Sequence, residues 1–259
     1  MSVLVALDSS EIRLELLASA QALAAAAGWP LRIVHVRGEG ESKFALPAKL
    51  RGAAEVTEVE GAAAEQILQA AAAEDVRVLA FALRDSEQGA VGAVAGALLL
   101  NDPHPLFVLR PGMRAVTTMR RLLVPMEGSP STSEAMRQAD DVFCRRGREI
   151  VMLHVVTSGT PLEAGSMPAP RMVDQEHYEW AAWQEEFRMR FAQCPEGGRH
   201  RVAVRVGEPA ELIPKEALAL GAEMIVLSWT RSLEAGHSQQ VQSLFDSSPC
   251  PLLLIPTAA

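Results

Sequence analysis

The chain has 259 residues, of which 49% are hydrophobic and 22% are charged, and its formal net charge is −8. The acidic excess is evenly divided, because residues 1–119 contain 10 basic and 14 acidic residues while residues 120–259 contain 14 and 18. Nucleic-acid surfaces need clustered cations, so this balance argues against a nucleic-acid partner.

The N-terminus and the cysteines indicate the compartment. Met1 is followed directly by an apolar strand pattern, without the basic and apolar regions of a secretory signal. The longest apolar stretch, residues 90–100, is shorter than the roughly 20 residues that span a bilayer. Cys144, Cys194 and Cys250 lie far apart, which favours reduced thiols over a disulfide or a zinc site. We therefore expect a soluble, cytoplasmic protein.

The first half alternates short apolar strands with helical segments, the pattern of a parallel sheet with helices on both faces. The expected strands are Val3–Leu7, Leu31–Val36, Val56–Val59, Val76–Ala82 and Pro105–Leu109. A first helix is expected between the capping residues Ser9 or Ser10 and Gly28. Two further helices are expected near residues 63–73 and 90–100.

The second half repeats the first. Residues 3–36 reappear at 122–155, an offset of 119 that aligns Asp8 with Glu127 and His35 with His154. Residues 59–68 and 102–111 reappear at 206–213 and 248–256, at an offset of 146. An internal repeat means two copies of one structural unit. We expect domains at 1–112 and 120–259, with an inserted segment at about 158–199 in the second.

Within the second half, a strand at Leu122–Pro125 precedes a helix that Ser129 caps and that runs to about Arg146, followed by a strand at Ile150–Val155. The insertion predicts an amphipathic helix with Val173, Trp180, Phe187 and Phe191 on one stripe and Trp183 nearby. Such a stripe is usually a packing face. The alternative is a lid over the second site or a surface for a partner.

Several of these segments together resemble the universal stress protein family. They are the opening strand that ends in Asp8, the strands that end in H-V at Val36 and Val155, the V-x-V-G-x-P-A-E-x-I segment at 204–213, and P-C-P at 249–251. The resemblance implies an α/β fold with two tandem five-stranded parallel sheets flanked by helices and related by an internal pseudo-two-fold. Family members pair through the last strand, so we expect 105–109 and 252–255 to pair antiparallel. The chain would then be a pseudo-dimer, and a further homodimer stays open.

Nucleotide-binding members of the family carry G-x-x-G, nine residues and G-[ST] after the fourth strand. Glycines let backbone amides approach the phosphates, and the following helix adds partial positive charge. In the first copy, residues 82–85 read A-L-R-D, Gly92-Ala93 occupies the G-[ST] position, and Gly89 with Gly92 offers a displaced substitute. In the second copy, S-W-T-R begins at Ser228, Ser238 takes the G-[ST] position, and Gly236 fits only with a register shift. Neither copy satisfies the motif.

The residues at the nucleoside end of the implied cleft match the family pattern better than the phosphate-binding loop does. The resemblance places Asp8 at the acid that faces the nucleoside, with Glu127 in its place in the second copy; the alternative is a helix cap or a strand-end residue. Ala6 and Pro125, with Val36 and Val155, would line the wall. We interpret His35 and His154 as hydrogen-bonded strand-end residues, and we expect neither catalytic residues nor a metal site.

The expected function is a non-catalytic binding or signalling role in the stress response, with degenerate nucleotide sites in both copies and no cofactor. Its partner would be another protein or a second copy of the chain. One alternative is a protein that binds ATP or AMP through the first copy, with feeble hydrolysis at most. Another is a carrier of a different small molecule in the same cleft, gated by the insertion.

Overall fold

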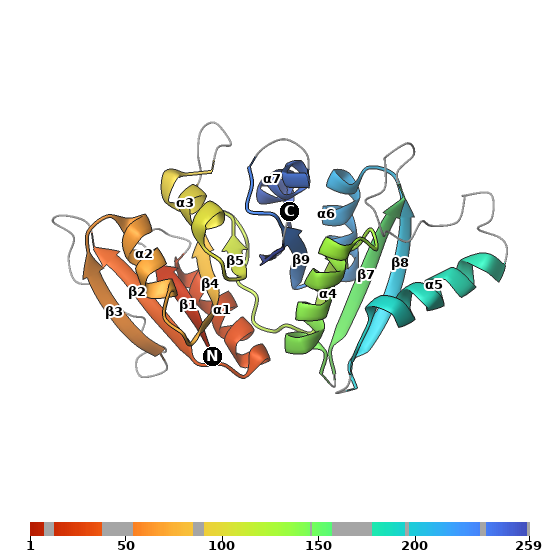
Figure 1. Cartoon of the computed structure of the whole chain (residues 1–259), viewed down its shortest axis with the longest axis horizontal. Coiled ribbons are helices and arrows are strands. Elements are labelled where there is room, and N and C mark those ends of the chain that lie inside the picture. Colours follow the sequence, from red (N-terminus) through yellow and green to blue (C-terminus); the bar gives the residue numbers. More distant parts are fainter. Residues whose placement is uncertain are drawn as a thin grey trace.

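The computed structural model describes residues 1–7, 13–37, 54–84, 91–145, 147–156, 178–194, 197–233 and 237–257, and these form one ten-stranded sheet between two helix layers (Figure 1). The first-half strands are β1 (Ser2–Leu7), β2 (Leu31–Arg37), β3 (Ala54–Glu60), β4 (Val76–Ala82) and β5 (Leu106–Leu109). The second-half strands are β6 (Arg121–Pro125), β7 (Glu149–Val156), β8 (Arg199–Val206), β9 (Met224–Trp229) and β10 (Leu252–Pro256). The strands expected from the sequence are confirmed to within two residues at each end.

Two buried clusters lie on opposite faces of the sheet. Helices α1 (Arg13–Ala27), α4 (Pro130–Phe143) and α5 (Tyr178–Phe191) contribute to one cluster. Helices α2 (Ala63–Ala71), α3 (Ala93–Asn101), α6 (Pro209–Leu220) and α7 (His237–Ser247) contribute to the other. Inner strands such as β1, β5 and β10 are buried along most of their length because they are covered from both sides, which explains their unbroken apolar runs. The edge strands β3 and β8 are mostly exposed or half-buried and include charged residues.

The strand order is β3-β2-β1-β4-β5-β10-β9-β6-β7-β8, so each half has the order 3-2-1-4-5. Within each half all neighbouring strands are parallel. The halves meet where β5 and β10 pair antiparallel, with Phe107 opposite Leu253. The expected pairing of the two last strands is confirmed. Each of these strands covers an edge that would otherwise be exposed.

Local sequence signals explain the helix ends. The Ser129 hydroxyl oxygen accepts a hydrogen bond from the Thr132 N–H at 3.4 Å, and Pro130 occupies the first helical position of α4. Gly28 ends α1 with a φ of +71°, which is favourable only for glycine. Helix α4 ends at Phe143 rather than near Arg146, because Cys144 leaves the helical conformation with a ψ of 81°. Ser9 and Ser10 lie outside the described residues.

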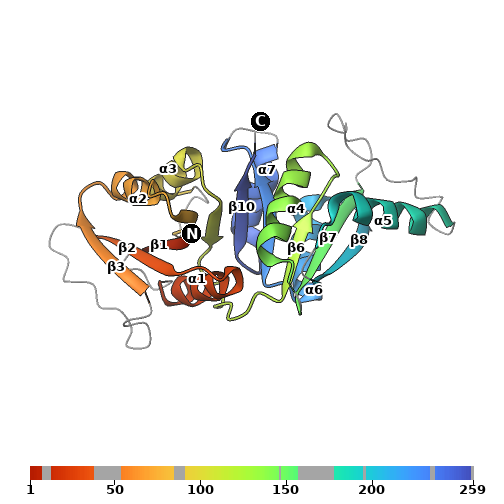
Figure 2. The same ribbon diagram turned by 60° about the horizontal axis from the view of Figure 1, so that its bottom comes forward.

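The described part of the insertion is a helix that packs on the sheet. In α5, Trp183 is 7% exposed and Phe187 is fully buried, and both rings contact His154 at centroid distances of 5.1 and 5.6 Å. Figure 2 shows α5 beside β7 and β8. The packing-face interpretation of the helix is confirmed for these two residues. Val173 lies outside the described residues.

A disulfide links the insertion to the body of the second half. It joins Cys144 to Cys194, with their Cα atoms 5.4 Å apart. The expectation of three reduced thiols is therefore wrong, because α5 brings the chain back to the end of α4 after 50 residues. Cys250 is a free, buried thiol.

Among the described residues, no helix is long and apolar enough to cross a bilayer.

Candidate functional site

The first half has a pocket of about 350 Å³ at the carboxyl ends of β1, β2 and β4. The direction of strand order reverses between β1 and β4, and open α/β sheets bind ligands at such a switch point. Helices α2 and α3 close the sides of the pocket. Its described lining is Ala6, Leu7, Leu16, Val36, Ala63, Ile67, Phe81, Ala82, Arg84, Gly92, Ala93, Val94, Ala95 and Leu98.

Four predicted site residues meet in this pocket: Ala6, Val36, Gly92 and Ala93. Gly92 is the N-cap of α3, and no side chain caps this helix end. The first N–H groups of a helix give its N-terminus a partial positive charge. Arg84, whose side chain carries a full positive charge, also lines this pocket. Asp8 and Gly89, which were also predicted, lie outside the described residues.

A second pocket lies in the same place in the second half, but it holds only about 40 Å³. Four predicted residues meet here too: Pro125, Glu127, Val155 and Ser228. Its other described lining residues are Met126, Thr132, Leu153, Pro209, Ile213, Leu227 and Val241. Of the remaining predictions, Gly236 lies outside the described residues, and Ser238 lies in α7 with a side chain that the structure does not describe.

The repeat explains why the two pockets differ in size. Four alanines of the first pocket correspond to larger residues in the second. The pairs are Ala6 and Pro125, Ala63 and Pro209, Ala82 and Ser228, and Ala95 and Val241. One pair changes in the opposite sense, from Phe81 to Leu227. Small-molecule sites usually have volumes of roughly 300–1,000 Å³, so the first pocket falls in their range and the second does not.

Two matched histidines hold the strand ends that carry the pocket walls. His35 Nδ1 lies 3.0 Å from the main-chain oxygen of Leu7, and His154 Nδ1 lies 2.9 Å from that of Met126. Both histidines are buried, and both carbonyls belong to pocket-lining residues. Desolvation lowers the pKa of His154, so the neutral ring donates its Nδ1 proton to the carbonyl. The interpretation as hydrogen-bonded strand-end histidines is confirmed.

Sequence reasoning missed part of the lining. Ala63 and Pro209 follow Gly61 and Gly207, which correspond to each other at the offset of 146. Both glycines have a strongly positive φ, of +132° and +143°, and turn the chain into the helix that forms the pocket wall. Comparison of the residues after each glycine was the signal that would have identified this wall. Arg84 was not among the predicted site residues, although it lines the pocket.

The fold and the paired pockets define a tandem α/β protein with one switch-point cleft in each half. The model of the universal stress protein family matches residues 118–256, more than half of the chain. The chain therefore belongs to the universal stress protein family. The matched region is the second half, and the first half has the same strand order and pocket position.

Solved structures agree with a tandem arrangement. A universal stress protein from Archaeoglobus fulgidus aligns with a TM-score of 0.66 and 17% identity, and the alignment covers 98% of each chain. A functionally unknown protein from Pseudomonas aeruginosa aligns with a TM-score of 0.68 and 12% identity, over 98% of this chain and 92% of that one. At these identities the likeness is one of fold. No curated protein matches the sequence.

Proposed function

We propose that this universal stress protein is a non-catalytic binding protein whose first-half pocket is its ligand site. The difference in pocket volume, about 350 against 40 Å³, is the observation that carries the proposal. In the second half, proline, serine and valine occupy the space that four alanines leave open in the first. The second pocket is then a degenerate site that serves the core of its half.

The ligand class follows from the lining. Apolar side chains such as Val36, Ile67 and Leu98 suit the faces of an aromatic base. Arg84 and the N-terminus of α3 suit one anionic group at the other end. We infer that AMP fits this pocket better than ATP, because the predicted loop lacks the glycines that would hold a triphosphate.

The absence of catalysis rests on the same lining. General acid–base or nucleophilic catalysis needs a titratable or nucleophilic side chain within reach of the reacting atoms. Among the described lining residues of the first pocket, Arg84 is the only ionisable one, and arginine does not give up its proton. ATP hydrolysis is therefore not an expected activity. Binding of a protein partner or self-association stays a prediction.

Calorimetric titration with AMP, and separately with ATP and Mg²⁺, tests the proposal. We expect one AMP per chain, weaker binding of ATP, and no phosphate release. Val36→Trp should fill the first pocket and abolish binding, whereas the matched Val155→Trp in the second half should leave it unchanged. No heat at millimolar nucleotide with folded protein, or loss of binding in Val155→Trp alone, would contradict the proposal.

A further inference from the structure

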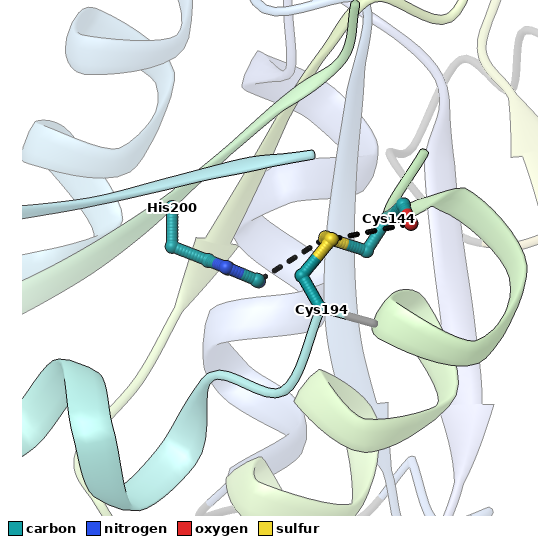
Figure 3. A group of neighbouring side chains, drawn as sticks. All are labelled: Cys144, Cys194 and His200. Carbon is teal, nitrogen blue, oxygen red and sulfur yellow. Dashed lines mark hydrogen bonds between the residues drawn. A yellow bond between two sulfur atoms is a disulfide. The ribbon is translucent and has the colours of Figure 1, made fainter. Parts of the chain in front are cut away.

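Three metal-binding side chains from distant parts of the sequence meet at the end of α4, outside both pockets (Figure 3). Cys144 is the C-cap of α4, Cys194 follows α5, and His200 is the second residue of β8. Their ligand atoms all lie within 4.8 Å of one another. We expected no metal site in this chain, because no short ligand spacing exists in the sequence. The fold brings these three residues together although they are far apart in the sequence.

The separation of the Cys144 sulfur from the His200 nitrogen suits a tetrahedral zinc ion, whereas the two sulfur atoms, which are bonded to each other here, must move apart to bind one. With bonds of about 2.3 Å to sulfur and about 2.0–2.1 Å to nitrogen, a sulfur and a nitrogen ligand lie about 3.6 Å apart. The Sγ of Cys144 and the Nε2 of His200 are 3.6 Å apart. Asp140 Oδ1 is 2.6 Å from the same nitrogen, so a shift of less than about 1 Å makes it a fourth ligand.

The cluster is mostly buried, although Cys194 is only half-buried, and the main chain holds Asp140 in place. The side chains of His200 and Asp140 are 5% and 3% exposed, and Cys144 is 3% exposed. The main-chain N–H of Gln193 donates to Asp140 Oδ2 at 2.7 Å, which leaves Oδ1 directed at His200. Metal ligands are commonly oriented by such second hydrogen bonds.

The backbone beside the two sulfur atoms leaves them room. The main-chain N–H of Gly198 donates to Cys194 Sγ at 3.0 Å, as a donor to a thiolate would. A Cβ atom at Gly198 would lie 2.7 Å from the Sγ of Cys144 and 2.9 Å from that of Cys194. Glycine at this position therefore permits the close approach of the chain to both sulfur atoms.

The oxidation state decides what the cluster can bind. In the structure the two sulfur atoms are bonded to each other, so neither is a thiolate ligand. A dithiol reductant gives the disulfide two electrons and two protons and becomes a disulfide itself. Zn²⁺ then binds the two thiols and releases their two protons. The Nε2 proton that His200 donates to Asp140 must move to Nδ1, so that neutral His200 binds the metal through Nε2.

We propose that Cys144, Cys194 and His200, with Asp140 as the fourth ligand, form a zinc site that replaces the disulfide when the protein is reduced. Either bond fastens the segment after α5 to the end of α4. The anchor of the insertion thus persists in both redox states, through a covalent bond in one and through the metal in the other.

The test is a titration of the TCEP-reduced full chain with Co²⁺ and Zn²⁺ under nitrogen. We expect one Co²⁺ per chain, with the thiolate charge-transfer and visible bands of a tetrahedral site, and displacement of Co²⁺ by Zn²⁺. The disulfide form should bind neither ion. Zn²⁺ should also restore the melting temperature that reduction lowers. If reduction unfolds the chain, Zn²⁺ must restore the fold.

Variants separate this site from adventitious binding. Cys144→Ser and His200→Asn should abolish the cobalt spectrum, and Asp140→Asn should weaken zinc binding by roughly 10–100-fold. Cys250→Ser is the matched control, because Cys250 is a buried thiol outside the cluster and should leave binding unchanged. A reduced protein without the thiolate bands, an unchanged spectrum in Cys144→Ser or His200→Asn, or no effect of Zn²⁺ on stability would overturn the proposal.

Discussion

The indole nitrogen of Trp229 donates a hydrogen bond to the main-chain oxygen of Leu99, 2.9 Å away, across the junction of the two halves. Leu99 lies in the last turn of α3, where carbonyl groups have no partner within the helix. Trp229 ends β9 and is only 1% exposed. The second half thus satisfies a helix end of the first.

This bond predicts the effect of Trp229→Phe. Phenylalanine keeps most of the buried ring but leaves the Leu99 carbonyl without its donor. We expect the free energy of unfolding to fall by about 1–3 kcal/mol, the typical cost of an unsatisfied buried polar group. Urea unfolding measures it, and an unchanged midpoint and slope would show that the bond contributes nothing.

The position of Gly92 allows a sharp test of the first pocket. A Cβ atom there meets no heavy atom within 4 Å, and a φ of −59° is open to any residue. Gly92→Trp should therefore leave the free energy of unfolding within about 0.5 kcal/mol of the parent. AMP affinity, measured by calorimetry, should fall at least tenfold. Leu218→Trp is the control, because Leu218 is an exposed residue of α6, and it should not change the affinity for AMP.

The buried histidine of the second half predicts a pH dependence. Desolvation lowers the pKa of His154 below the ordinary 6.5, and the bond to the Met126 carbonyl opposes this shift only in part. The unfolded chain therefore takes up the proton first as the pH falls. The contribution of His154 to stability is fully present above pH 6.5 and is lost as the pH falls from there through the lower folded-state pKa.

Denaturation between pH 8 and pH 5 checks this direction. His154→Gln should be less stable at pH 8, because it lacks the same hydrogen bond, but its stability should fall less steeply below pH 6.5. A steeper fall in the variant, or an NMR titration of His154 above 6.5, would contradict the assignment of a neutral buried ring.

Gly198 and Gly96 should respond in opposite ways to alanine. At Gly198, a Cβ atom would lie within 2.9 Å of both disulfide sulfur atoms and 3.1 Å from the Arg145 nitrogen. We expect Gly198→Ala to lower the free energy of unfolding by about 1–3 kcal/mol, through overpacking. At Gly96, inside α3, the nearest atom is Val91 Cγ1 at 4.0 Å. Gly96→Ala should raise the free energy of unfolding by up to about 1 kcal/mol. Thermal or urea unfolding of the two variants measures both changes, and changes of the same sign would contradict the prediction.

The division into two matching units was predictable because the sequence repeats, and the antiparallel junction because the resemblance to the universal stress protein family implies it. Equal offsets aligned His35 with His154, and both make the same hydrogen bond to the strand before them. Four described lining residues of each pocket were predicted from the resemblance, among them the matched strand-end pairs Ala6 and Pro125, and Val36 and Val155. Each of these paired residues lies in the strand that positions it, so a local sequence pattern was enough to predict its place.

The disulfide and the closure of the second pocket could not be predicted, because they depend on contacts between residues that are far apart in the sequence. Cys144 and Cys194 meet because α5 folds back along the sheet, and the sequence between them gives no sign of that path. The closure of the second pocket depends on the summed bulk of residues from three strands and three helices. The exchange of Ala63 for Pro209 was visible beforehand, but its effect needed the pocket geometry.

The joining of β5 to β10 within one chain also removes a constraint on change. In a symmetric dimer of identical subunits, every substitution appears twice, so one cleft cannot close while the other stays open. Here the two clefts are encoded by separate codons, and Ala95 persists in one while Val241 fills the other. Within one chain the two clefts are free to differ, as their volumes of about 350 and 40 Å³ do.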